Sequence, residues 1–512
     1  MSFGSVRDTT QNFARSPENG ITKLDAMLDR AISHKECLHL LQARAAQLTV
    51  SSTAALLLCL VVLYLLTAST YNAYFHKLAA FPGPLLGRCS LVRPVVRISP
   101  NELSFASVES WKAIYGHRAA GAAPVTKSEF YDIYGAGFKS LCIGSERDPH
   151  KHGQMRRMLS AAFSTKMLLD QEDIITKTVD AFVHRLGEDR FRTEGLNMTK
   201  WYEMIAFDSL GEMAFGESFH SVKAGKPHSW SEIIVSHLYF ITLVDNLRRL
   251  PFVATAARVL LPSTLAVQNQ NSQYSRKKVE ERLSKKSNRN DFLSTVVKSY
   301  EVGAISKEEM AAHVSTLTIA GGETTATFLA AATYYLLQNP ACLLKLQTEI
   351  TAKFSSFEEI NATAARQLPY LQAVISEGLR LYAPGSQGFP RLSPGMNVGD
   401  IYVPAGAEVF THTWTLTHSE GYFSDPKSFK PERWLDAGST DVREASQPFS
   451  MGPRGCLGQN FAYMEINLIL AKMLWQYDLE LVDKDLDWEQ ESQLHVMWWK
   501  PALMVRFTHR TP

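Results

Sequence analysis

The sequence predicts a large, mainly α-helical domain with small β-sheets, preceded by one transmembrane helix. Three observations predict this fold class. Helical patterns dominate residues 148–339, the period-two alternation of strands is confined to short stretches such as 399–413, and an uncharged apolar segment precedes both. The chain has 512 residues, of which 45% are apolar, and this suffices for a large core.

The composition argues against several functions. A net charge of +2 gives no reason to expect a nucleic-acid partner. The cysteines are scattered and include no CxxC pair, which argues against a disulfide framework and a zinc site and fits a reducing compartment. They are Cys37, Cys59, Cys89, Cys142, Cys342 and Cys456.

The chain divides into three predicted parts, which are an N-terminal extension over 1–44, a transmembrane anchor over 45–75 and a large domain over 76–512. No residue between Arg44 and His76 is charged, and about 20 apolar residues cross a bilayer as a helix. A cleaved signal peptide is the alternative, but the segment is long and lies far from the first residue. We therefore expect a single-pass membrane protein.

The clearest helix of the large domain covers 306–340. Ser306 and Glu309 form a capping box at its start, and Pro340 marks its end. It is apolar nearly all round, so it should run through the core. The other predicted elements, in chain order, are a proline-glycine elbow at 81–88, two strands within 94–105, a helix at about 365–382, paired strands at 399–413 and a helix at 459–477.

The stretch FSMGPRGCLGQN, residues 449–460, places Gly452, Gly455 and Gly458 around a single thiol, Cys456. Ordering each glycine costs conformational entropy, so three glycines in one short loop indicate a specific structural or functional role. A collagen repeat does not fit because the period stops, whereas a structural loop with an incidental cysteine remains an alternative. One cysteine cannot build a four-ligand zinc site. It can be the single axial ligand of haem iron, since the porphyrin supplies the other four ligands.

The surroundings of Cys456 suit a thiolate. A helix beginning near Gly458 directs free N–H groups and a positive dipole end at the sulfur. Arg454 can pair with a haem propionate, and Phe449 can pack against the ring. Together with Gly452, these residues reproduce the haem-binding signature FxxGxRxCxG of the cytochrome P-450 family.

The resemblance to cytochromes P-450 extends over residues 76–512, because four further motifs follow in the family's order. It implies the P-450 fold, with Cys456 as the axial ligand of haem iron and Phe449, Gly452, Arg454 and Gly458 in the haem-binding loop.

The stretch AGGETT, residues 320–325, lies midway along the predicted long helix. Glycine inside a helix costs about 1 kcal/mol relative to alanine. Close helix packing would explain the pair, and so would a local opening of the helix over the haem. The stretch resembles the family's AGxxTT oxygen-activation motif, which implies that Glu323 and Thr324 form an acid–alcohol proton relay.

Glu377 and Arg380 are spaced as an i,i+3 pair among apolar neighbours, which predicts burial. They resemble the family's ExxR motif, and FKPERW, residues 429–434, resembles the partner motif that contributes Arg433. The resemblance implies a buried structural network of these three side chains that braces the haem loop.

Three further residues are expected at the haem propionates. HGQMRRMLSAAFS, residues 152–164, resembles the helix with the family pattern WxxxR; Arg156 fits the pattern and His152 replaces the tryptophan. A plain surface helix is the alternative. Arg391, which follows GFP, resembles another propionate-binding residue.

The resemblance implies a haem-thiolate monooxygenase that contains haem b and takes electrons from NADPH through NADPH–cytochrome P-450 reductase, with cytochrome b5 as a further partner. Phrases such as SAAFS and HVMWWKPAL resemble filamentous-fungal enzymes of secondary metabolism. The expected reaction is hydroxylation or epoxidation of a lipophilic small molecule, a terpenoid or a polyketide. We expect an anchor in lipid at the endoplasmic reticulum, with the catalytic domain in the cytosol.

Two alternatives stay open. One is a haem-thiolate oxidase that catalyses desaturation, ring formation or isomerisation. The other is a catalytically impaired haem-binding membrane protein, because the segment between Pro84 and Val95 is a few dozen residues shorter than in the family. That departure is either a deletion or an incomplete gene prediction.

The substrate pocket is expected within 105–147, 216–262, 384–391 and 493–500, by position in the resembling fold. The apolar side chains in these ranges predict a lipophilic substrate. They include Phe240, Ile241, Leu243, Phe252, Met497 and Trp498.

Overall fold

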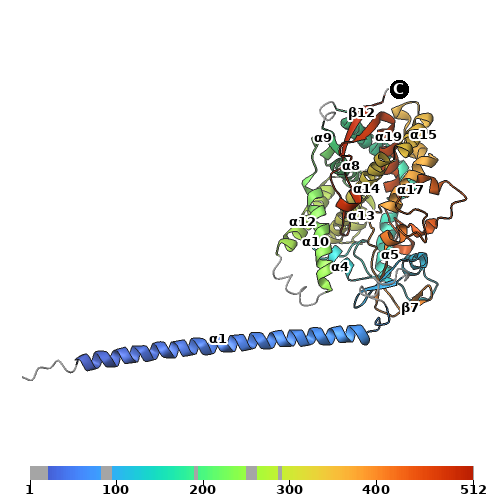
Figure 1. Cartoon of the computed structure of the whole chain (residues 1–512). Helices are drawn as coiled ribbons and strands as arrows, with labels where there is room; N and C mark the ends of the chain where they lie inside the picture. The colour runs from blue at the N-terminus through green and yellow to red at the C-terminus, as the bar shows by residue number, and fades with distance from the viewer. Residues whose placement is uncertain (1–20, 82–94, 189–193, 250–261, 286–290, 511–512) are drawn as a thin grey trace, which may run out of the picture. The chain divides into compact units, whose positions relative to one another are not determined.

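The structure is a computed structural model, and it describes residues 21–81, 95–188, 194–249, 262–285 and 291–510. The chain forms two compact units, Met1–Ala79 and Ala80–Pro512 (Figure 1). The short segment between Pro84 and Val95 lies outside the described residues, and so does Phe252.

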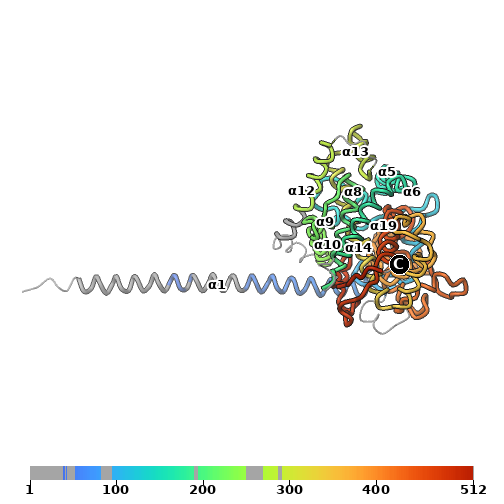
Figure 2. The backbone as a smooth tube through the Cα atoms, turned by 90° about the horizontal axis from the view of Figure 1, so that it is seen from above, coloured from blue at the N-terminus to red at the C-terminus, as the bar shows by residue number. Residues whose placement is uncertain are grey.

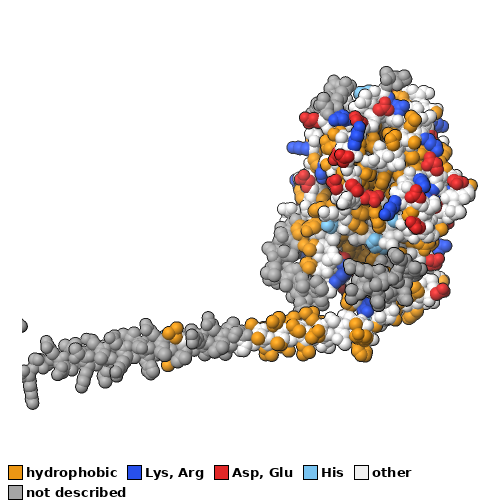
Figure 3. Space-filling model, in the orientation of Figure 1, with side chains coloured by type: hydrophobic (Ala, Val, Ile, Leu, Met, Phe, Trp, Pro, Cys, Tyr) orange, Lys and Arg blue, Asp and Glu red, His pale blue; other side chains and the backbone are white. Residues whose placement is uncertain are grey.

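The described part of the first unit, residues 21–79, contains the helix α1 (Ile21–Tyr74). Its part Ser52–Tyr74 is long and apolar enough to cross a membrane; at 1.5 Å per residue it spans about 35 Å, against about 30 Å of bilayer hydrocarbon. Figure 3 shows hydrophobic side chains gathered along this part. The hydroxyls of Thr67 and Thr70 donate to backbone carbonyls one turn earlier, so these two polar groups are satisfied within the helix. The helix continues upstream of residue 45, where a boundary was expected.

The second unit is mostly helical, as predicted. Its α-helices are α3 (Val108–Ser110), α4 (Phe130–Tyr134), α5 (Pro149–Ser160), α6 (Thr165–Leu169), α7 (Glu172–Leu186), α8 (Met198–Phe215), α9 (Ser221–Ala224), α10 (Ser229–Arg248), α12 (Pro262–Ser284), α13 (Ser294–Glu301), α14 (Lys307–Gln338), α15 (Pro340–Lys353), α16 (Ala362–Ala365), α17 (Pro369–Leu381), α18 (Thr413–Thr417), α19 (Gln459–Gln476) and α20 (Trp488–Glu491). Single turns of other helix types are η2 (Trp111–Tyr115), η4 (Phe357–Glu359), η5 (Pro431–Trp434), η6 (Arg443–Ala445) and η7 (Gly452–Arg454).

The strands form small sheets. They are β1 (Val95–Ser99), β2 (Glu102–Phe105), β3 (Thr126–Lys127), β4 (Leu196–Asn197), β5 (Arg391–Leu392), β6 (Met396–Val398), β7 (Ile401–Val403), β8 (Glu408–Thr411), β9 (Tyr477–Leu481), β10 (Gln493–Leu494), β11 (Trp498–Trp499) and β12 (Met504–His509). The largest sheet has the order β1-β2-β8-β5-β3; the others are β4-β12-β9, β6-β7 and β10-β11.

Helix α14 runs through the core, as its all-round apolar sequence predicted. In Figures 1 and 2 it lies in the middle of the second unit, and α8 packs against it. Its start is fixed by Ser306, whose hydroxyl accepts a hydrogen bond of 3.0 Å from the Glu309 N–H. Pro340, which follows its end, begins α15. This helix and α19 supply two walls of the cavity described below.

One strand prediction was wrong. The segment 399–413 contains two strands, β7 and β8, and the turn near Gly406 is present with a φ of +73°. The two strands do not pair with each other, because β7 pairs with β6 whereas β8 pairs with β2 and β5. Alternation in a sequence reports the strand conformation but not the partner, which depends on distant segments.

Candidate functional site

Cys456 lies in a tight loop just before the start of α19. Its backbone N–H donates to the Phe449 carbonyl at 2.8 Å, which closes the loop. Gly452 has a φ of +68°, and a Cβ there would lie 2.1 Å from the Tyr115 carbonyl oxygen. Only glycine therefore fits at this position. The loop brings the sulfur to the N-terminal end of α19.

The Cys456 side chain is accessible because it faces a cavity of about 330 Å³. Burial within the domain raises the pKa of this thiol, whereas the backbone N–H groups of Gly458 and Gln459 and the charge of Arg156 act in the opposite direction. Backbone N–H groups and a cation near a sulfur stabilise its thiolate form. The loop thus has the features that a thiolate ligand needs.

The cavity has mostly apolar walls. The loop 448–458 with α19 lines one part, and α14 lines another through Ala320, Gly321 and Thr324. The other apolar and aromatic side chains that line it include Phe130, Tyr131, Tyr134, Ile143, Phe163, Leu210, Phe292, Leu317, Phe328, Leu379, Phe389, Val496 and Met497. Such a lining, with few polar groups, is typical of cofactor and small-molecule sites.

Basic side chains from separate elements converge on one part of this cavity. They are Lys127, His152, Arg156, Arg391 and Arg454. Among the described residues that line the cavity there is no aspartate or glutamate. The guanidinium of Arg454 donates to the backbone carbonyls of Glu146 and Arg147 at 2.8 and 2.9 Å, and that of Arg156 donates to the Gly455 carbonyl at 2.7 Å. These cations are held by backbone dipoles rather than by carboxylates.

The crowding of positive charge shows in the pKa values. Burial and the neighbouring Arg391 guanidinium lower the pKa of Arg454 to about 10. Burial, Arg454 and Arg391 likewise lower the pKa of Lys127. A dianionic group placed here would neutralise the mutual repulsion. The two propionates of haem have this charge, so the residues present fit the cofactor.

Lys127 is a residue of this cluster that the sequence did not indicate. Strand β3 pairs with β5 so that Lys127 lies opposite Arg391, and its ammonium donates to the carbonyls of Ile143 and Gly144 at 2.7 and 2.5 Å. Nothing in the neighbouring sequence distinguishes this lysine. Only the pairing of two short, distant strands brings it to the cavity.

His152 provides a prediction for the pH dependence of stability. Burial, followed by Arg454, Lys127 and the other nearby cations, lowers the pKa of His152 from 6.5 to about 3. Between these values the unfolded chain binds a proton that the folded, haem-free chain does not. The contribution of His152 to stability is therefore fully present above pH 6.5 and is lost as the pH falls toward 3. Thermal unfolding of the haem-free protein over this range is expected to show the loss.

The variant His152→Gln is expected to have a flatter pH dependence over the same range, because the glutamine does not titrate. The matched control is His117→Gln, since His117 is exposed, and this variant is expected to keep the slope of the unaltered protein. Equal slopes in His152→Gln and the unaltered protein would contradict the placement of His152 among buried cations.

The AGGETT stretch is helical throughout in α14, so the local opening considered from the sequence is not present. Close packing accounts for the glycines. A Cβ on Gly321 would lie 3.0 Å from Leu210 Cδ1, and one on Gly322 would lie 3.1 Å from Phe207 Cδ2, both of α8. Two glycines therefore let α8 and α14 approach closely.

The structure separates the two residues of the expected proton relay. Thr324 lines the cavity, and its hydroxyl donates to the Ala320 carbonyl at 2.7 Å. Glu323 is buried and is not among the described residues that line the cavity; its carboxylate accepts hydrogen bonds from Lys500 Nζ and, at 3.2 Å, from Thr327 Oγ1. Neighbouring side chains on a helix diverge by about 100°.

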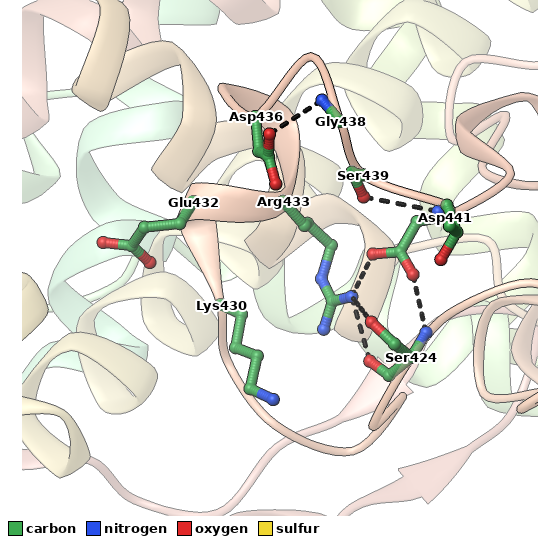
Figure 4. A pocket seen from close by; sticks show the side chains of 9 residues that line it. Ser424, Lys430, Glu432, Arg433, Asp436, Gly438, Ser439 and Asp441 are labelled. Atoms are coloured by element: carbon green, nitrogen blue, oxygen red, sulfur yellow. Dashed lines mark hydrogen bonds and ion pairs between the residues drawn. The ribbon is translucent and has the colours of Figure 1, made fainter.

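The structure brings Glu377, Arg380 and Arg433 together in a buried cluster. Arg380 donates to both Glu377 oxygens at 2.8 Å, and Arg433 Nε donates to Oε1 at 3.1 Å. On its other side Arg433 contacts Asp441 and the Ser424 carbonyl, as Figure 4 shows. Asp441 was not expected from the sequence, because it lies in a loop without a recognisable pattern.

The remaining predicted residues divide into two groups. Phe449, Gly458 and Met497 line the cavity. Phe240, Ile241, Leu243 and Trp498 are not among the described residues that line it. Trp498 instead donates through its indole N–H to the Ala383 carbonyl at 2.9 Å.

Comparison with known proteins gives a consistent result. The family described as "Cytochrome P450" matches residues 60–507. The cytochrome P450 monooxygenase ORF9 of Penicillium roqueforti (strain FM164) is 58% identical over 467 residues, covering 87% of this chain and 92% of that protein. The cytochrome P450 monooxygenase BOT4 of Botryotinia fuckeliana is 55% identical over 475 residues, covering 88% and 90%. The crystal structure of the cytochrome P450DA heme domain matches with a TM-score of 0.67 at 17% identity, covering 80% of this chain and 88% of that one, which shows the same fold.

Proposed function

The chain belongs to the cytochrome P450 family and is a monooxygenase of that family, and from this premise we propose that it hydroxylates or epoxidises a lipophilic small molecule. We propose as substrate a terpenoid or polyketide intermediate of fungal secondary metabolism. Electrons come from NADPH through a membrane-bound flavoprotein reductase. The candidate span Ser52–Tyr74 anchors the protein in the endoplasmic reticulum, with the catalytic domain in the cytosol.

The observation that carries this proposal is the composition of one cavity. It combines one cysteine, Cys456, with a cluster of buried and half-buried basic side chains and with walls that are otherwise apolar, and no aspartate or glutamate is among the described residues that line it. In the proposed role Cys456 Sγ would bind haem iron, while Arg156, Arg391, Arg454 and their neighbours His152 and Lys127 would hold the propionates. Haem supplies the activation of dioxygen.

The protein's own residues then have three tasks. The apolar walls exclude water and bind the carbon skeleton of the substrate. The Thr324 hydroxyl holds a proton at the cavity wall. In the structure this hydroxyl donates to the Ala320 carbonyl. Glu323 supplies protons from a face of α14 that does not line the cavity, and therefore its carboxyl must exchange protons with solvent before it can donate.

The proposal is tested by incubating the enzyme in membranes with a reductase, NADPH, isotopically labelled dioxygen and a panel of terpenoids and polyketides. We expect NADPH consumption that depends on substrate, and a product that contains one labelled oxygen atom. A product that is two hydrogens lighter, or an isomer without label, would favour the haem-thiolate oxidase instead. Selective binding of small, highly charged compounds would contradict a lipophilic substrate.

A further inference from the structure

A buried cation joins the expected proton donor to a second helix. Lys500 follows β11, and its side chain is only 3% exposed. Its ammonium contacts the carboxylate of Glu323 on α14, donates to Thr327 Oγ1 at 3.0 Å, and lies 3.6 Å from the carboxylate of Glu203 on α8. The side chains of Glu323 and Glu203 are 7% and 9% exposed. One cation therefore serves two buried carboxylates.

The charges of this cluster do not balance internally. Two carboxylates around one ammonium leave a net charge of −1, which is costly in a low-dielectric interior. Lys200 compensates it from the outside, because its half-exposed ammonium lies 2.8 Å from Glu203 Oε2. The cluster thus runs from solvent at Lys200, through Glu203 and Lys500, to Glu323 beside the cavity.

The titration of the cluster follows from these contacts. Burial raises the pKa of Glu323, Lys500 acts against this, and Glu203 adds to it by repulsion. The two carboxylates raise the pKa of Lys500 against the effect of burial. Among the described residues, Tyr382 also interacts electrostatically with Glu323, and its hydroxyl donates to Ser492 at 2.7 Å. When the cluster takes up a proton, the proton therefore binds to a carboxylate, and the ammonium stays charged.

We propose that Lys500 is a positioning residue that holds Glu323 away from the cavity, and that Glu203 is a reserve counter-ion that allows Glu323 to be released. Breaking a buried ion pair is costly mainly because it leaves an unpaired charge. Here the ammonium keeps Glu203 as its partner when Glu323 takes up a proton from solvent or turns toward Thr324. Uptake converts the Glu323 carboxylate to a carboxylic acid, and Lys500 keeps all its protons. This inference rests on the proposed function, in which Glu323 donates protons.

The test is infrared spectroscopy of the full-length, haem-loaded protein in membranes, with the carboxylic acid band of Glu323 followed against pH. Glu323→Gln identifies the band; this step is needed because burial also raises the pKa of Glu465 to about 8. In Lys500→Met we expect the titration midpoint of Glu323 to rise by about one pH unit, which is a tenfold lower proton concentration. In Glu203→Gln we expect a shift in the opposite direction, because the repulsion is gone. Lys500→Arg is expected to restore the midpoint of the unaltered protein.

The matched control is Lys472→Met. Lys472 is another buried lysine, 1% exposed, and it pairs with Asp180 rather than with this cluster. Its loss is expected to leave the Glu323 midpoint unchanged. Product formed per NADPH consumed is the second readout, and it is expected to fall in Glu203→Gln and Lys500→Met but not in the control.

An unchanged Glu323 midpoint in both Lys500→Met and Glu203→Gln would overturn the inference. Glu203→Gln leaves Lys500 in place as the partner of Glu323. The Glu323 midpoint can therefore still be measured in this variant when Lys500→Met fails to fold. If the midpoints shift as expected while the unaltered protein oxidises no lipophilic compound, the proposed function fails and the positioning of Glu323 by Lys500 stands.

Discussion

Replacement of Cys456 by alanine is expected to abolish substrate oxidation and NADPH consumption. Cys456 is the one cysteine among the described residues that line the cavity, and without its thiol no side chain there would supply haem iron with a thiolate, on which the oxidation chemistry of such a haem depends. The loop itself should persist, because Gly452 and the hydrogen bond from the Cys456 N–H to the Phe449 carbonyl do not involve the side chain. The measurement is product formation in membranes with a reductase and NADPH.

The control for this variant is Cys342→Ala, because Cys342 lies in α15 and is not among the described residues that line the cavity. We expect it to keep full activity. Retention of substrate oxidation in Cys456→Ala would show that the thiol has no role in the chemistry.

Replacement of Glu377 by glutamine is expected to lower the free energy of unfolding by about 3–5 kcal/mol, because it leaves two buried arginines without their shared counter-ion. Glu377, Arg380 and Arg433 have side chains that are 0–3% exposed. Glu377 also accepts hydrogen bonds from the indole of Trp434 and the backbone N–H of Lys430. The variant therefore disturbs the segment that precedes the cysteine loop. Urea unfolding followed by circular dichroism measures the change.

Glu358→Gln serves as the matched control, since Glu358 is exposed on η4. A surface change of this kind is expected to alter stability by no more than about 0.5 kcal/mol. The same unfolding midpoint for Glu377→Gln and Glu358→Gln would rule out a structural role for the buried cluster.

The elements that the sequence predicted best depend on local signals. Helix α14 was expected from its cap at Ser306, its stop at Pro340 and its apolar surface, and all three act within the segment itself. The partners of β7 and β8 were predicted wrongly, since strand pairing is decided by segments far apart in the chain. The role of the AGGETT glycines was also not predictable from nearby sequence, because it depends on side chains of the distant helix α8 that pack against them.

The residues of the candidate site also differ in whether nearby sequence was enough to predict them. The cysteine loop and the Glu377 cluster were recognisable because each is encoded in one or two short motifs. Lys127 and Lys500 were not, because each acts through a contact with a residue more than a hundred positions away, Arg391 and Glu323 respectively. The side of α14 on which Glu323 lies also follows from packing and not from its motif.

The carbon monoxide difference spectrum of the reduced protein in membranes tests most directly whether Cys456 holds haem iron as a thiolate. We expect the red-shifted Soret band that is typical of thiolate-ligated haem. An unshifted band in correctly inserted protein, or a protein that binds no haem, would contradict it.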